Sequence, residues 1–191
     1  MSECLGVVIA GGLSSRMGTD KAQLERDGQV MLRYTTQLLE QLGLDVVLSG
    51  QGGIQDLVVE AGPVGGIYSV LQQQPAKALL VVPVDMPLLT KDALAVLLDS
   101  GEESGAAVCY EDAYLPLYLP VNEQLKDYLA TLFETGELPE NKRALSIKTM
   151  LTEIESLQVA FQQQGELLIN TNTPEEWQAA MAKLTEVSNA E

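Results

Sequence analysis

Short apolar, β-branched runs alternate along the chain with segments of helical periodicity. Residues 5–10 form a compact apolar run, residues 45–49 are centred on Val46-Val47-Leu48, and residues 78–84 are almost entirely apolar, as expected of a buried central strand. Between the first two runs, apolar residues recur every three or four positions over 31–42, which predicts an amphipathic helix that Gly43 ends. This alternation predicts strands joined by helices.

The rest of the chain continues the pattern. It predicts helices at residues 64–74, 90–99, 125–133 and 144–154 and strands at 106–109, 115–119, 157–161 and 167–169, with mostly loop at 50–63. Thr173 precedes Pro174, and Glu176 follows three residues later, a capping box that predicts the start of a last helix. The order favours a single α/β domain, residues 1–191, with a mainly parallel sheet and helices on both faces. Ligands of such sheets bind at the carboxyl ends of the strands.

The charge of the chain excludes some classes of partner. With 11 Lys and Arg against 27 Asp and Glu, the net charge is −16, and such a surface repels nucleic acids and anionic membranes. No apolar stretch approaches the length of a membrane span, and no basic segment precedes the first apolar run, so we expect neither an anchor nor a signal peptide. Cys4 and Cys109 lack metal-ligand spacing, which favours a reducing, cytoplasmic location.

The chain contains no histidine. This excludes Ser-His-Asp and Cys-His catalysis, imidazole metal ligands and a histidine general base. Any chemistry must therefore use carboxylates, Lys, Arg, backbone amides or a metal ion.

A glycine-rich loop follows the first predicted strand. Gly11 and Gly12 allow backbone amides to approach phosphate oxygens closely, Arg16 offers a forked donor pair, and Lys21 adds a positive charge. The spacing matches neither the P-loop nor the dinucleotide-binding fingerprint. From the residues alone, a phosphate-binding loop and an ordinary strand-to-helix turn both remain open.

A carboxylate follows the third predicted strand at the same sheet edge. Asp85 lies between Pro83 and Pro87, which restrict the backbone on both sides. Phosphates in the same cleft would call for Mg²⁺, which binds one or two carboxylates together with phosphate oxygens and water. The alternative is a helix-capping acid.

The glycine-rich segment carries a family resemblance. It resembles the signature of nucleotidyltransferases that activate sugars and cofactors, and most of all that of the molybdenum cofactor guanylyltransferase (MobA) family, over Ile9-Ala10-Gly11-Gly12-x-Ser14-x-Arg16-Met17-Gly18-x-Asp20-Lys21. The resemblance implies a Rossmann-like three-layer α/β/α fold and GTP bound with its phosphates over Gly11, Gly12, Arg16 and Lys21. Asp20 either orients Lys21 or lies in solvent.

The resemblance also implies roles for acidic and amide side chains. Asp85-Met86-Pro87 matches the family's Asp-x-Pro motif, whose Asp binds Mg²⁺, and Arg16, Lys21 and Asp85 are the implied catalytic set. Asp56 stands where the family contacts guanine, and Gln51 is the nearest match to a family Asn, although the segment before Asp56 is shorter here. A solvated loop acid is the alternative for Asp56. The implied nucleotide-binding residues are Ile9, Ala10, Gly11, Gly12, Ser14, Lys21, Gln51, Asp56 and Asp85.

The acceptor side rests on two further segments. Asn170 and Asn172 match the family's closing Asn-x-Asn-Thr-Pro-Glu-Glu motif, which implies a position near the acceptor and pyrophosphate; a plain helix start is the alternative. Lys142 and Arg143, with Lys148, form a basic cluster that either binds a terminal pterin phosphate or is a solvated helix face.

Together these features predict Mg²⁺-dependent transfer of GMP from GTP to the terminal phosphate of molybdopterin, with release of pyrophosphate. The product would pass to a molybdoenzyme or its delivery chaperone, and we expect a monomer or a weak homo-oligomer. The alternatives are a molybdopterin cytidylyltransferase, a sugar-phosphate nucleotidyltransferase, and a homologue that binds nucleotide without turnover.

Overall fold

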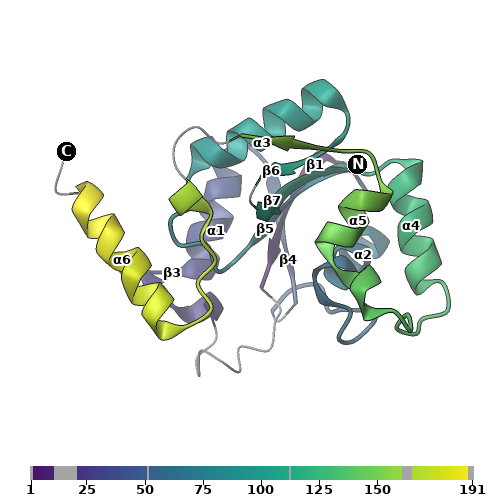
Figure 1. Cartoon of the computed structure of the whole chain (residues 1–191), viewed down its shortest axis with the longest axis horizontal. Coiled ribbons are helices and arrows are strands. Elements are labelled where there is room, and N and C mark those ends of the chain that lie inside the picture. The colour runs from purple at the N-terminus through teal and green to yellow at the C-terminus, as the bar shows by residue number, and fades with distance from the viewer. Residues whose placement is uncertain (1, 11–20, 51, 112, 161–164, 189–191) are drawn as a thin grey trace.

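The computed structural model describes residues 2–10, 21–50, 52–111, 113–160 and 165–188. A six-stranded sheet forms its middle layer (Figure 1). The strands are β1 (Ser2–Ile9), β4 (Asp45–Ser49), β5 (Ala76–Pro83), β6 (Ala107–Tyr110), β7 (Ala113–Pro120) and β8 (Ser156–Val159). Their order is β4-β1-β5-β7-β6-β8, and β7 runs antiparallel to both neighbours while the other pairs are parallel. The prediction of a mainly parallel sheet is confirmed.

Helices cover both faces of this sheet (Figure 1). One face carries α1 (Met31–Glu40) and α3 (Lys91–Ser104), and the other carries α2 (Gly62–Gln73), α4 (Glu123–Phe133) and α5 (Ile147–Glu153). The last helix, α6 (Pro174–Ser188), lies on the α1 side, where Trp177 packs against the core. The three-layer α/β/α architecture is confirmed.

Strand β1 shows why both faces need helices. Val7 points into a core shared with Ile67 of α2, whereas Val8 points into a second core shared with Leu39 of α1. All four side chains are fully buried. Burial of each stabilises the fold by about 1.5–3 kcal/mol relative to exposure, so a two-sided apolar strand requires two covering layers.

Two predicted elements differ from the structure. The strand predicted at 167–169 is wrong, because the backbone there forms the 3₁₀ helix η3 (Gly165–Leu168), whose Leu168 is buried in the core. The single helix predicted at 144–154 is interrupted, because the Ser146 hydroxyl accepts a hydrogen bond from Thr149 N at 3.1 Å and starts α5 at Ile147. An N-cap residue has extended rather than helical backbone, so it separates the two turns.

A small hairpin that the periodicity does not predict precedes α1. Strands β2 (Glu25–Arg26) and β3 (Gln29–Val30) pair antiparallel after the 3₁₀ helix η1 (Lys21–Gln23). Asp27 and Gly28 connect them with φ of 51° and 75°. Positive φ at both central residues is what a tight two-residue hairpin turn requires, and Asp-Gly is a favoured pair for it.

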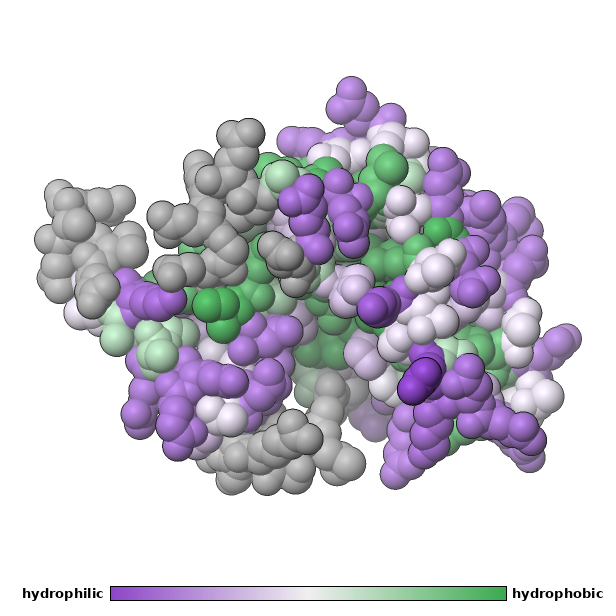
Figure 2. Space-filling model, in the orientation of Figure 1, coloured by the Kyte–Doolittle hydropathy of each residue, from purple (hydrophilic) through white to green (hydrophobic). Residues whose placement is uncertain are grey.

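Hydrophilic residues cover the outer parts of the face shown in Figure 2, and hydrophobic residues appear toward its middle. None of the helices in the described ranges is long and apolar enough to cross a membrane.

Candidate active site

The carboxyl ends of β1 and β5 lie side by side at one sheet edge. Ile9 O accepts a hydrogen bond from Val84 N at 3.2 Å, and Ala10 N donates to Ser49 O of β4 at 3.0 Å. Ala10, the last described residue before the glycine-rich segment, and Asp85 therefore follow neighbouring strands at this edge. The predicted residues Gly11, Gly12, Ser14, Arg16 and Gln51, together with Asp20, lie outside the described residues.

Three of the predicted site residues meet at this edge. The Lys21 ammonium donates one hydrogen bond of 2.8 Å to Asp85 Oδ2 and another of 2.8 Å to Asn172 Oδ1. The Lys21 and Asp85 side chains are only 18% and 20% exposed. Segments 64 and 151 residues away from Lys21 thus place two oxygen ligands on one positive charge.

The other carboxylate oxygen of Asp85 shows what else the site can hold. Asp85 Oδ1 is buried and accepts no hydrogen bond from the residues that the structure describes. A buried carboxylate oxygen without a donor is unfavourable unless a ligand compensates it, and carboxylate oxygen is a preferred ligand of Mg²⁺. No cluster of three Cys, Asp or Glu side chains suited to a metal gathers among those residues. A magnesium ion here would therefore depend on Asp85 together with phosphate oxygens and water.

The closing motif contains a contact that the sequence analysis missed. Thr171 N and Thr171 Oγ1 both donate to Asp85 O, at 2.9 and 3.1 Å, and Thr171 is fully buried. Asn170 and Asn172 on either side are exposed. Thr171 thus points into the protein where the two flanking asparagines face solvent.

The predicted capping box closes this segment. Glu176 Oε2 accepts hydrogen bonds from Asn172 N at 2.6 Å and Thr173 N at 3.1 Å, and Glu176 N donates to Thr173 Oγ1 at 3.2 Å. The capping box is confirmed. Because Glu176 belongs to α6, Asn172 is attached to the first turn of that helix.

Asp56 lies in the loop between β4 and α2. The next residue, Leu57, donates its N–H to Ser69 Oγ of α2 at 2.9 Å, which fixes the loop against the helix. The Asp56 side chain is exposed overall, but the neighbouring chain removes enough water from the carboxylate to raise its pKa above the usual value. A carboxylate at this sheet edge is available to a ligand.

Lys142 and Arg143 lie in the 3₁₀ helix η2 (Lys142–Leu145), and Lys148 lies on α5. All three residues are exposed. The η2 segment packs beside the start of α2, where Leu145 O lies 3.8 Å from the position that a Cβ on Gly62 would occupy. The basic residues therefore flank the same helix start that follows the Asp56 loop. Their exposure fits both alternatives stated for them.

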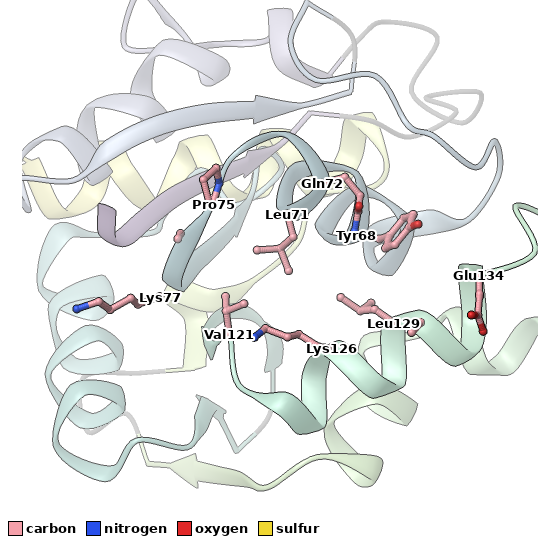
Figure 3. Close-up of a pocket in the computed structure, with 11 residues that line it drawn as sticks. Tyr68, Leu71, Gln72, Pro75, Lys77, Val121, Lys126, Leu129 and Glu134 are labelled. Atoms are coloured by element: carbon pink, nitrogen blue, oxygen red, sulfur yellow. The ribbon is translucent and has the colours of Figure 1, made fainter. Parts of the chain in front are cut away.

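A separate cavity of about 820 Å³ lies between α2, α4 and the start of β5 (Figure 3). Apolar side chains such as Leu71, Val121 and Leu129 line it, with Lys126 and Glu134 at the surface. Its lining includes none of the predicted site residues, so this cavity is distinct from the Lys21–Asp85 site.

Comparisons with known proteins give a consistent result. The model of the family described as the MobA-like NTP transferase domain matches residues 6–150. A molybdenum cofactor guanylyltransferase from Xanthomonas euvesicatoria pv. vesicatoria (strain 85-10) is 38% identical over 90% of this chain and 91% of its own. Another from Shewanella sp. (strain W3-18-1) is 26% identical over 97% of this chain and 99% of its own. Among solved structures, molybdopterin-guanine dinucleotide biosynthesis protein A from Archaeoglobus fulgidus has a TM-score of 0.66 at 18% identity, over 95% of this chain and 98% of its own.

Proposed function

The chain belongs to the family of MobA-like NTP transferase domains and is a nucleotidyltransferase, and from this premise we propose that it transfers GMP from GTP to the terminal phosphate of molybdopterin with the help of Mg²⁺. Nucleotidyl transfer in molybdenum-cofactor biosynthesis is the activity that its curated relatives carry in their names. The identity of the base, the metal and the acceptor is the added content of the proposal.

The observation that supports it most directly is the meeting of Lys21, Asp85 and Asn172 at the carboxyl edge of the sheet. In the proposed reaction, an oxygen of the acceptor phosphate attacks the α-phosphorus of GTP in line, and the bond to pyrophosphate breaks. The Lys21 ammonium stabilises negative charge on the triphosphate as it shifts toward the leaving group. Asp85 would hold Mg²⁺, which supplies further neutralisation of that charge when bound.

This chemistry needs no histidine. A phosphate monoester is already largely ionised near neutral pH, so the attacking oxygen requires positioning more than deprotonation. Binding and orientation by Lys21, Asn172 and the backbone amides of the glycine-rich loop would account for most of the rate. The exposed Lys142 and Arg143 are the proposed contacts of the acceptor phosphate, and Asn170 is proposed to lie near the acceptor.

Asp56 is the proposed determinant of the base. An ionised carboxylate can accept from the N1–H and the exocyclic amine of guanine together, a pair of donors that cytosine and uracil lack. The exposed position of Asp56 in a loop held against α2 leaves it free to do so.

The first experiment measures pyrophosphate release from GTP in the presence of molybdopterin and Mg²⁺. Lys21→Ala and Asp85→Asn should each lower kcat/KM by about 100-fold or more, the scale expected when a preorganised charge at the reacting group is removed. Lys91→Ala, which removes an exposed lysine at the start of α3, is the matched control and should behave as the wild type. Full activity in Lys21→Ala would contradict the mechanism.

A second experiment separates the remaining alternatives by calorimetric titration of GTP, CTP and UTP with Mg²⁺. Preference for GTP supports the proposal, and preference for CTP indicates a cytidylyltransferase. Tight GTP binding without pyrophosphate release in the presence of molybdopterin identifies a non-catalytic homologue. Release that requires a sugar phosphate instead of molybdopterin would assign the other acceptor.

A further inference from the structure

We propose that Thr171 is a positioning residue that anchors residues 170–173 on the backbone of Asp85. This anchor lets the Asp85 carboxylate and the Asn172 amide oxygen both accept hydrogen bonds from the Lys21 ammonium. The inference rests on the proposed function for its catalytic consequence. Its structural content is independent of the base and of the acceptor. The segment lies beyond residues 6–150, to which the family model extends.

The anchor consists of two hydrogen bonds to one oxygen. Thr171 N and Oγ1 donate to Asp85 O at 2.9 and 3.1 Å. Val84, the residue before Asp85, is tied to β1 through its N–H and Ile9 O. The backbone that carries the Asp85 carboxylate is thus attached to the sheet on one side and to the C-terminal segment on the other.

The flanking residues show that this contact is specific. Thr171 is fully buried, whereas Ile169 is 38% exposed and Asn170 and Asn172 are exposed. Within residues 169–172, Thr171 is therefore the point at which the segment enters the protein interior. Two directional hydrogen bonds from one buried residue to the same carbonyl oxygen restrict the position of the segment more than apolar contact alone does.

The anchor determines where Asn172 lies. Asn172 follows Thr171 directly, and its Oδ1 accepts from Lys21 Nζ at the same 2.8 Å as Asp85 Oδ2 does. Glu176 holds Asn172 N and Thr173 N, so Asn172 moves together with the start of α6. Loss of the Thr171 hydroxyl should let Asn172 and the start of α6 shift away from Asp85. Asn172 Oδ1 and Asp85 Oδ2 would then no longer both contact the Lys21 ammonium.

The test compares Thr171→Val with Thr171→Ser, which keeps the hydroxyl. Thr185→Val is the matched control, because it removes an exposed hydroxyl from the far end of α6. Thr171→Val should raise the Mg²⁺ concentration for half-maximal activity, and the dissociation constant of Mg²⁺–GTP measured by calorimetry, by about five- to tenfold, the effect of one net hydrogen bond. Thr171→Ser should stay within about twofold of the wild type by the same reasoning, and Thr185→Val should be unchanged.

Fluorescence provides a readout that does not depend on turnover. Trp177 is the single tryptophan of the chain and lies in the first turns of α6, partly buried against the core. Acrylamide quenching of Trp177 without ligands should increase in Thr171→Val and remain at the wild-type level in Thr171→Ser and Thr185→Val. Equal quenching and equal Mg²⁺–GTP affinity in Thr171→Val and wild type would overturn the proposal.

Hydrogen exchange on the wild type keeps the test decisive if Thr171→Val does not fold. The Thr171 amide should exchange more slowly than the amide of exposed Asn170, because it is hydrogen-bonded to Asp85 O. Equal rates would overturn the proposal. If the wild type binds Mg²⁺–GTP but does not transfer GMP to molybdopterin, the proposed function fails, while the quenching, binding and exchange results still decide the role of Thr171.

Discussion

The two carboxylates of the candidate site differ in what surrounds them. Asp85 has one oxygen on the Lys21 ammonium and the other buried, which suits a metal ligand. Asp56 is exposed in a loop, and partial loss of hydration raises its pKa. A carboxylate whose ionised form has lost part of its hydration, and which is accessible to a ligand, is suited to accept hydrogen bonds from a base.

The raised pKa of Asp56 predicts a pH dependence of GTP recognition. Guanine donors need the ionised carboxylate, so the KM for GTP should rise as pH falls through the raised pKa, at higher pH than for an ordinary aspartate of pKa 3.8. Asp56→Asn should lose this dependence and the preference for GTP over CTP. Steady-state kinetics with both nucleotides, from pH 7 down to about pH 4, measure it, and identical profiles for the two proteins would exclude Asp56 from base recognition.

The raised pKa of Asp56 also determines whether its ionisation stabilises or destabilises the fold. Because the fold favours the protonated form of Asp56, its contribution to stability is greatest below the unfolded-state pKa and is lost as pH rises through the raised folded-state pKa. Asp56→Asn should therefore not lower the melting temperature at pH 7. A large loss of stability would show that the charge has a structural partner.

Motifs predicted Lys21, Asp85 and Asn172 because their side chains carry chemistry that a short sequence pattern can encode. The meeting of their side chains, however, depends on strand order, which the sequence pattern does not specify. Thr171 escaped prediction for a different reason: its partner is a backbone carbonyl 86 residues away, and any residue has such a carbonyl. Contacts of this kind become visible only in three dimensions.

At the scale of elements, the start of α2 lies directly against the end of β4. A Cβ on Gly66 would lie 2.5 Å from Ser49 Oγ and 3.7 Å from Asp56 Oδ1. Glycine at this position therefore lets α2 approach both the end of β4 and the loop that carries Asp56. Gly66 therefore serves close packing of the helix against the loop that carries Asp56.

Gly66→Ala should push α2 away from β4. Overpacking costs about 1–3 kcal/mol, offset by roughly 1 kcal/mol because alanine favours a helix over glycine, so a net loss of about 1 kcal/mol is expected, with a higher KM for GTP. Thermal unfolding and kinetics measure both effects. Ser49→Ala in the same chain removes the clashing oxygen and should restore stability; if the double variant is as destabilised as Gly66→Ala alone, the contact with Ser49 is not the cause.

Periodicity predicted long elements better than short ones. Helix α1, with ten residues, begins at Met31 as the period over residues 31–42 predicts, because several repeats of the pattern fall within it. The segment at 167–169 is too short for period 2 and period 3 to be distinguished, and burial of Leu168 is satisfied equally well by a 3₁₀ turn. Where few residues define a pattern, tertiary packing decides the backbone.

At the scale of the whole molecule, each of the two hydrophobic cores, one on either face of the sheet, contains one cysteine. Cys109 belongs to the core beneath α2, α4 and α5, and Cys4 to the core beneath α1 and α3. Both are buried. Burial raises the pKa of the Cys109 thiol. Burial, and to a smaller extent the negative charge of Glu102, raise the pKa of Cys4 to about 12. Neither thiol should therefore react in the folded protein.

If residues 1–191 form one cooperative domain, both thiols should react only when the whole fold opens. Labelling with an aromatic disulfide at pH 8 should then proceed at the same rate in Cys4→Ser, which reports on Cys109, and in Cys109→Ser, which reports on Cys4, once each rate is corrected for the stability of its variant. Addition of Mg²⁺–GTP should slow both rates by the same factor, because a ligand that binds only the native state lowers the open population of the entire unit. Rates that differ, or a ligand effect confined to one thiol, would show that the two hydrophobic cores open separately. The chain would then not be a single cooperative domain.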